Sequence, residues 1–190
     1  MKKNLDPKCV AFPQPVFIIG SYDKDGVPNA MNAAWCGQTT FTTLEINLSS
    51  HKSTENILEQ KAFTVFPADV SHLEVSDYFG MATGRKLNKA ERSGLTFVKS
   101  EHVNAPLIVE YPVAIECEVV EVQKLEHDWR IVGKIVNVQA DEAVLDEKGA
   151  IDFSKMRALV YDPAHRSYRI VGEELGKAWD AGKAFFSPKD

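Results

Sequence analysis

Apolar and polar residues alternate along several short stretches of the chain, as they do in β-strands with one buried face. Residues 44–48 and 113–119 show this alternation most clearly, and most of the other stretches contain valine, isoleucine or aromatic residues. The stretches predicted as strands are 16–22, 27–35, 44–48, 62–66, 113–119, 131–138 and 168–171. The turn Asp25-Gly26 predicts a hairpin between the first two strands, and Gly133 permits a bend in the sixth.

The helices predicted from capping residues and glycines are short. They begin near Ser53, at Ser71 and at Asn88, and a fourth covers residues 173–181. Ser71 has Glu74 three residues later, as in a capping box, and Gly80 is the expected end of that helix. Gly94 is the expected end of the helix that starts at Asn88. Strands without a regular strand–helix alternation predict a mainly β fold, an antiparallel barrel with short peripheral helices.

Length and composition indicate one globular domain. The 190 residues contain no linker, low-complexity segment or repeat, so we expect a single domain over residues 1–190 with its core at about 10–180. The net charge of −5 comes without a basic block, which argues against nucleic-acid and anionic-membrane binding. No apolar stretch is long enough for a membrane span or a signal peptide. The three cysteines are scattered, which predicts no disulfide framework, no zinc site and a cytoplasmic location.

The first chemical feature lies where the strand ending at Leu48 meets the helix expected near Ser53. The first N–H groups of a helix are unpaired and carry partial positive charge, so a phosphate monoester gains hydrogen bonds and a favourable charge there. The residues predicted to hold such a phosphate are Ser49, Ser50, His51, Lys52, Ser53 and Thr54. The alternative is an ordinary helix end, with Ser53 as the N-cap and Lys52 exposed.

The second feature is a strand of unusually small residues just before that loop. Small side chains let a flat ligand approach the backbone closely, so that backbone N–H and C=O groups can bond the edge of its ring. Trp35 is either part of the pocket wall or a core aromatic residue. The segment consists of Asn29, Ala30, Met31, Asn32, Ala33, Ala34 and Trp35, and it is followed directly by Cys36.

These two segments, in this order and spacing, resemble the flavin-reductase-like FMN-binding split-barrel family, and within it the flavoredoxin branch. The resemblance covers roughly residues 10–180. The other matching segments are 63–66, 93–97, 106–108 and 168–177. The family implies an antiparallel Greek-key split β-barrel and a homodimer with one FMN per subunit near the dimer interface. It implies that residues 29–36 line the isoalloxazine ring and that residues 49–54 hold the ribityl phosphate.

The resemblance also implies an oxidoreductase in which FMN carries the electrons, with no catalytic side chain and no metal. Members either oxidise NAD(P)H or hold FMN and pass electrons to a redox partner. Many reductases of the family have Gly-Asp-His before a Val-Gly-Glu strand. Here Asp128 stands at the histidine position, and His127 lies one residue earlier. This departure favours the alternative of an electron-transfer protein without its own NAD(P)H oxidation. A third alternative is a barrel that has lost flavin or holds another ligand, such as haem.

Three further features each leave two interpretations open. Residues 78–81 either cover one face of the flavin or pack the apolar side of a helix. Cys36 either takes part in redox chemistry or fills space. His165 and Arg166 either reach an anionic ligand or lie in a solvated turn.

Overall fold

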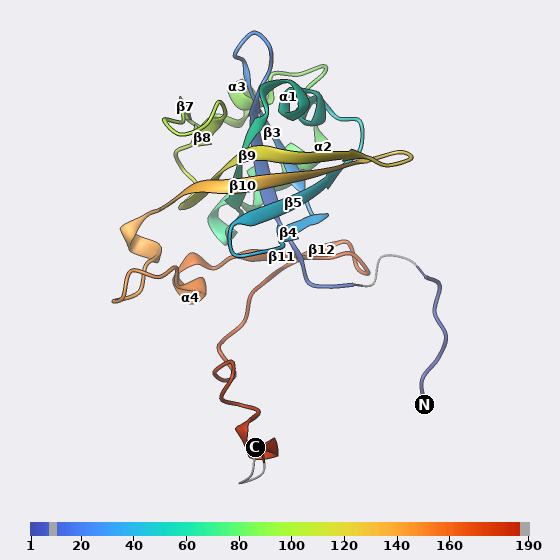
Figure 1. Ribbon diagram of the computed structural model, residues 1–190, viewed down its shortest axis with the longest axis vertical. Coiled ribbons are helices and arrows are strands. Elements are labelled where there is room, and N and C mark those ends of the chain that lie inside the picture. The colour runs from blue at the N-terminus through green and yellow to red at the C-terminus, as the bar shows by residue number, and fades with distance from the viewer. Residues whose placement is uncertain (8–10, 187–190) are drawn as a thin grey trace.

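The computed structural model describes residues 1–7 and 11–186. Its centre is an antiparallel seven-stranded sheet that curls into a half-barrel (Figure 1), with the strand order β3-β2-β6-β9-β10-β5-β4. These strands are β2 (Phe17–Tyr22), β3 (Pro28–Ala33), β4 (Cys36–Gln38), β5 (Thr43–Leu48), β6 (Ala62–Pro67), β9 (Val113–Lys124) and β10 (Trp129–Ala140). The prediction of a mainly β, antiparallel fold is therefore confirmed.

Two smaller sheets and several short helices surround the half-barrel. The smaller sheets consist of β1 (Gln14–Pro15), β11 (Leu159–Asp162) and β12 (Ser167–Ile170), and of β7 (Phe97–Lys99) and β8 (Pro106–Ile108). The α-helices are α1 (Lys52–Gln60), α2 (Leu73–Met81), α3 (Lys89–Ser93) and α4 (Phe153–Met156), and the 3-10 helices are η1 (Val70–His72), η2 (Glu142–Val144) and η3 (Lys183–Phe185). None of the helices in the described ranges is long and apolar enough to cross a membrane.

Both faces of β2 and β6 are buried, because side chains that alternate along each strand enter two different cores. On β2, Ile19 packs inside the half-barrel, whereas Ile18 packs outward beneath α2. On β6, Val65 packs inside the half-barrel and Phe66 packs outward. This two-sided burial explains why residues 62–66 are continuously buried and carry no alternating pattern.

The structure corrects three helix predictions. Helix α1 begins after His51, whose backbone is extended, so Ser53 lies inside the first turn and is not the N-cap. The second helical segment is capped by Asp69, whose carboxylate accepts hydrogen bonds from the backbone N–H groups of Ser71 and His72 at 2.7 and 3.2 Å. It continues through Gly80, so Ser71 is not its cap and Gly80 is not its end. The predicted cap at Asn88 and end at Gly94 are confirmed.

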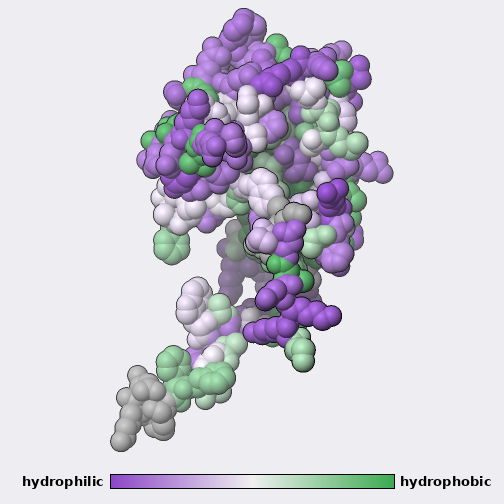
Figure 2. Space-filling view, turned by 90° about the vertical axis from the view of Figure 1, so that its right-hand side faces the viewer, coloured by the Kyte–Doolittle hydropathy of each residue, from purple (hydrophilic) through white to green (hydrophobic). Residues whose placement is uncertain are grey.

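The helix predicted over residues 173–181 is absent from the described chain. Residues 171–186 instead form an arm of irregular chain, turns and the short helix η3 that extends away from the body (Figure 1), and Figure 2 shows apolar side chains along it. Trp179 in this arm is 96% exposed. A short isolated helix is unstable without a packing surface, and Gly176 weakens it further.

Gly133 permits close packing inside the half-barrel. A β-carbon at this position would lie 2.5 Å from the ring of Phe63 and 2.9 Å from the β-carbon of Cys117, and the β9–β10 register shifts beside it. We expect Gly133→Ala to lower the free energy of unfolding by about 1–3 kcal/mol, because the buried Phe63 ring must move. Gly37→Ala in β4 is the matched control, since nothing lies within 4 Å of that position. Equal urea denaturation midpoints for the two variants would contradict the prediction.

Candidate functional site

Two adjoining cavities lie along β3 and the start of α1. The wide cavity, of about 480 Å³, extends from β3 to the β11–β12 turn. The cationic cavity, of about 290 Å³, lies between the start of α1 and the loop that follows α2. The residues that line both are Met31, Asn32, His51, Gly80 and Met81. Because these residues are shared, the two cavities adjoin and are together called the groove, and a ligand with two chemically different ends could occupy both.

The cationic cavity contains a buried ammonium group. Lys89 is only 3% exposed, and its Nζ donates a hydrogen bond to the backbone oxygen of Phe79 at 3.0 Å. Burial lowers the pKa of Lys89 to about 8. Lys52 lines the same cavity, with its Nζ 3.3 Å from Asp23. Among the described residues that line this cavity, none is acidic. The cavity therefore favours an anion.

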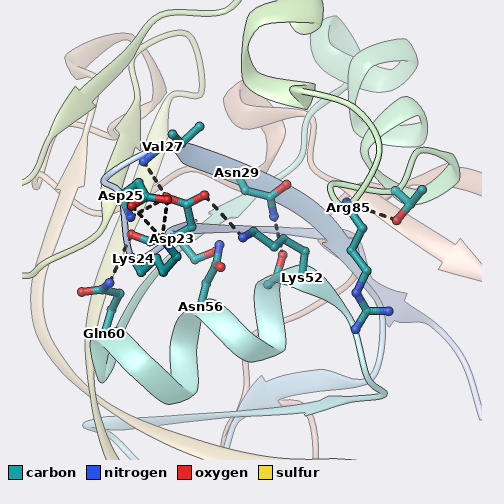
Figure 3. A network of polar contacts seen from close by, with 12 residues as sticks. Asp23, Lys24, Asp25, Val27, Asn29, Lys52, Asn56, Gln60 and Arg85 are labelled. Atoms are coloured by element: carbon teal, nitrogen blue, oxygen red, sulfur yellow. Dashed lines mark hydrogen bonds and ion pairs between the residues drawn. The ribbon is translucent and has the colours of Figure 1, made fainter.

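The first turn of α1 is held against β3 by a hydrogen bond between two buried side chains (Figure 3). The amide nitrogen of Asn29 donates to the Ser53 hydroxyl at 2.7 Å, which leaves the hydroxyl proton of Ser53 free for another acceptor. The Thr54 hydroxyl has a different task. It donates to the backbone oxygen of Ser49 at 2.6 Å and fixes the loop before the helix. Ser53 thus faces the cationic cavity, while Thr54 supports the loop.

The remaining residues of the predicted phosphate segment divide between the two cavities and the surface. Ser49 lines the wide cavity, and its hydroxyl donates to Asp128 at 2.7 Å. Ser50 accepts a hydrogen bond from Arg85 at 3.2 Å and lines neither cavity. His51 lines both cavities. Burial, together with the nearby charges of Arg85 and Lys89, lowers the pKa of His51, so its ring is neutral at pH 7.

The loop between α2 and α3 was missed by the sequence reasoning, although it closes one side of the cationic cavity. Ala82, Thr83 and Gly84 line the cavity, and a β-carbon at Gly84 would overlap the side-chain oxygen of Asn29. Arg85 follows and forms an ion pair with Glu55 on α1 at 2.5 Å. A run of small residues followed by a basic residue was the available signal.

Among the predicted ring residues, positions 31–35 line the wide cavity. Trp35, the last of these residues, is 48% exposed. Asn29 lines only the cationic cavity, and Ala30 is fully buried in the core. Cys36 lines neither cavity. Its thiol contacts the backbone oxygen of Ala33 at 3.3 Å, and burial raises the pKa of Cys36 to about 12, so the thiol stays protonated. A protonated thiol is a poor nucleophile, which favours the packing interpretation of Cys36.

The opposite walls of the wide cavity come from α2 and from the β1-β11-β12 sheet. Gly80 lets α2 approach β3, because a β-carbon there would lie 3.3 Å from the β-carbon of Asn32. The Tyr168 hydroxyl donates to Asp77 at 2.7 Å and joins β12 to α2. Within residues 78–81, Phe79 packs in the core and also lines the cationic cavity, and Gly80 and Met81 line both cavities.

His127 and Asp128 do not face the wide cavity. The His127 side chain is exposed and lies 3.4 Å from Glu126. Asp128 is the acceptor for Ser49, so it holds the loop before α1 in place. Within the described residues, no group of three or more histidine, cysteine, aspartate or glutamate side chains is arranged to bind a metal.

Comparison with known proteins identifies the family. A family model described as "Flavin reductase like domain" matches residues 9–170, and the chain belongs to this family. Flavoredoxin of Desulfovibrio vulgaris (Miyazaki F) is 36% identical, with a TM-score of 0.91 over 96% of this chain and 100% of that chain. Flavoredoxin from Methanosarcina acetivorans is 28% identical, with a TM-score of 0.90 over 98% of this chain and 100% of that chain.

Within the family, the chain stands with the flavoredoxin branch, and the split-barrel fold predicted from the sequence is confirmed. An uncharacterized protein of Archaeoglobus fulgidus is 31% identical over 130 residues, which is 66% of this chain and 73% of that protein.

Proposed function

We propose that this chain is an FMN-binding oxidoreductase, with the phosphate of FMN in the cationic cavity and the isoalloxazine ring in the wide cavity. The observation that carries the proposal is the buried Lys89 beside a cavity whose described lining is free of acids. A buried charge is costly unless it is paired, and a phosphate would pair it. Family membership supports the same cofactor.

The donors and walls of the groove fit FMN. The Ser53 hydroxyl, the first N–H groups of α1, Lys52 and Lys89 match the oxygens of a phosphate monoester. The small residues Ala33 and Ala34 leave room for a flat ring, with Trp35 and Met81 as apolar walls. We therefore keep Met31 to Trp35 as ring-lining residues and His51, Lys52 and Ser53 as residues near the phosphate. The ring-lining residues and the residues near the phosphate are held in position by Asn29, Ser49, Ser50 and Thr54. The strand that carries the ring-lining residues is supported from the core by Ala30 and Cys36.

Bound FMN would supply the electron chemistry, and the protein would bind and orient the ring and keep water from part of it. The first candidate activity is the transfer of electrons from NADH or NADPH to FMN. The second candidate is a flavoredoxin-type electron-transfer protein, which receives electrons from a redox partner protein. The hydrogen bond between Asp128 and Ser49 favours the second candidate, because this side chain is engaged by the loop before α1.

The absorption spectrum of the purified protein tests the proposal. We expect a flavin spectrum that survives desalting after incubation with FMN. Failure to retain FMN would remove the proposed function. Anaerobic mixing of the loaded protein with NADH and NADPH then separates the two candidates, since a reductase loses its yellow colour and a partner-dependent carrier keeps it.

We further propose that the chain forms one domain and acts as a homodimer in the cytoplasm. Val120 and Val138 are exposed on the long β9–β10 hairpin, and apolar side chains on a sheet surface are suited to contact with a second copy. Cys36 and Cys117 are free thiols, as expected in a reducing compartment. Light scattering of the FMN-loaded protein at several concentrations tests the dimer.

A further inference from the structure

Arg166 lies in the turn between β11 and β12 and lines the wide cavity but not the cationic cavity. Its backbone is left-handed, with φ of 52°. This conformation is uncommon for a residue other than glycine. The turn thus holds a guanidinium group at the end of the groove that does not contain Lys52 and Lys89.

Two neighbours of Arg166 along the chain, His165 and Arg169, are already engaged by a carboxylate. Both His165 and Arg169 contact the carboxylate of Asp162, at 2.9 and 3.1 Å. Arg166 has no ion pair with any of the described residues. The single acid of this turn is therefore satisfied, and the charge of Arg166 remains available to a ligand in the wide cavity.

The other titratable groups that line the wide cavity would direct an anion toward Arg166. Asp77 carries a negative charge on the α2 side and accepts the hydroxyl proton of Tyr168. Tyr161 lines the same cavity. His51 is neutral because burial and the adjacent cations lower its pKa. Arg166 is then the remaining positive group among the described lining residues.

We propose that Arg166 anchors an oxyanion, a phosphate or a carboxylate, of the small molecule that exchanges electrons with the flavin. A guanidinium binds either group through two parallel hydrogen bonds. The proposal rests on the proposed function, because it places the flavin ring in the wide cavity and the FMN phosphate in the cationic cavity. It adds a second anion site at the opposite end of the groove, which would select anionic reactants.

Calorimetric binding to the FMN-loaded protein tests this site with two probes, NADP⁺ and benzoate. Both are unable to reduce the flavin, so the readout is affinity and not activity. We expect Arg166→Gln to weaken the binding of at least one probe by about tenfold or more, since a charge-assisted bidentate contact is lost. Arg166→Lys should recover part of the affinity, because lysine keeps the charge but not the fork.

Arg157→Gln is the matched control. Arg157 is also exposed, has φ of 51° and lines neither cavity, so its replacement should leave both probe affinities unchanged. A loss with NADP⁺ alone identifies a dinucleotide phosphate as the ligand, and a loss with benzoate alone identifies a carboxylate. Unchanged affinities in Arg166→Gln, or no binding of either probe to the loaded wild type, would overturn the proposal. FMN uptake is measured separately for each variant, and failure of the wild type to take up FMN would instead remove the proposed function.

Discussion

Replacing Glu116 by alanine is expected to lower the free energy of unfolding by about 3 kcal/mol, because three donors lose one buried acceptor. Glu116 lies on β9 and is fully buried. Its carboxylate accepts hydrogen bonds from the Ser100 hydroxyl, from the amide of Asn137 at 2.6 Å and from the amide of Gln139 at 2.7 Å. The same group therefore ties the loop before β8 to the β9–β10 hairpin. Urea denaturation at neutral pH measures the effect.

The pH dependence of the free energy of unfolding is a second test of the role of Glu116. Burial acts to raise the pKa of Glu116, but the hydrogen bonds from Ser100, Asn137 and Gln139 outweigh it, and the pKa lies below its usual value of 4.5. The stabilisation is then fully present above the unfolded pKa and is lost as the pH falls through the lower, folded pKa. Glu118→Gln is the control, since Glu118 is exposed on the same strand. If Glu116→Ala and Glu118→Gln unfolded at the same urea concentration, the structural role of Glu116 would be wrong.

Replacing Lys89 by methionine is expected to weaken FMN binding by about 10- to 100-fold, because a charge-assisted hydrogen bond to the phosphate is lost. Methionine keeps much of the length and apolar volume of the lysine stem. Lys86→Met is the control three residues earlier, in the loop before α3, since Lys86 is exposed. Fluorescence titration with FMN measures both affinities. Equal affinities in the two variants would contradict the assignment of the cationic cavity to the phosphate.

The pH dependence of FMN binding should identify the same lysine. The pKa of Lys89 is lowered to about 8, so its charge is present at pH 7 and is lost as the pH rises toward 9. A phosphate monoester is already mostly dianionic above pH 7, with its second pKa at about 6. Wild-type affinity should therefore decrease across this window, while Lys89→Met should change little. Parallel pH profiles for the two proteins would mean that Lys89 does not contact the phosphate.

Half-barrel strands such as β5 were predictable where their side chains alternate between a buried and a more exposed face. The alternation at residues 44–48 gives β5 directly. By contrast, β1, β4 and β11 are two to four residues long, too short to show a period. The start of α1 was placed near Ser53, since serine is a preferred cap, whereas the extended backbone of His51 sets the true boundary.

The candidate site was predictable where it is continuous along the chain and not where distant segments meet. Residues 31–35 and His51 to Ser53 line the groove and could be proposed from local composition. Lys89 could not, because its side chain reaches the cavity only through the packing of α3 beside β3. The sequence leaves two interpretations of Arg166 open, an anion contact and a solvated turn, because its position in the cavity wall depends on how the β1-β11-β12 sheet is placed. Neither contact leaves a signal in local sequence.

Because the wide cavity lies between the half-barrel and the β1-β11-β12 sheet, a molecule bound there also affects the stability of the fold. Its walls join residues 31–35 of the half-barrel to Tyr161, Arg166 and Tyr168 of a separate sheet. A bound ligand is therefore a noncovalent cross-link that closes a long loop of the chain, and by mass action it stabilises the folded state by about 2.7 kcal/mol at a hundred times its dissociation constant. The β1-β11-β12 sheet would then depend on ligand supply for part of its resistance to local unfolding and proteolysis.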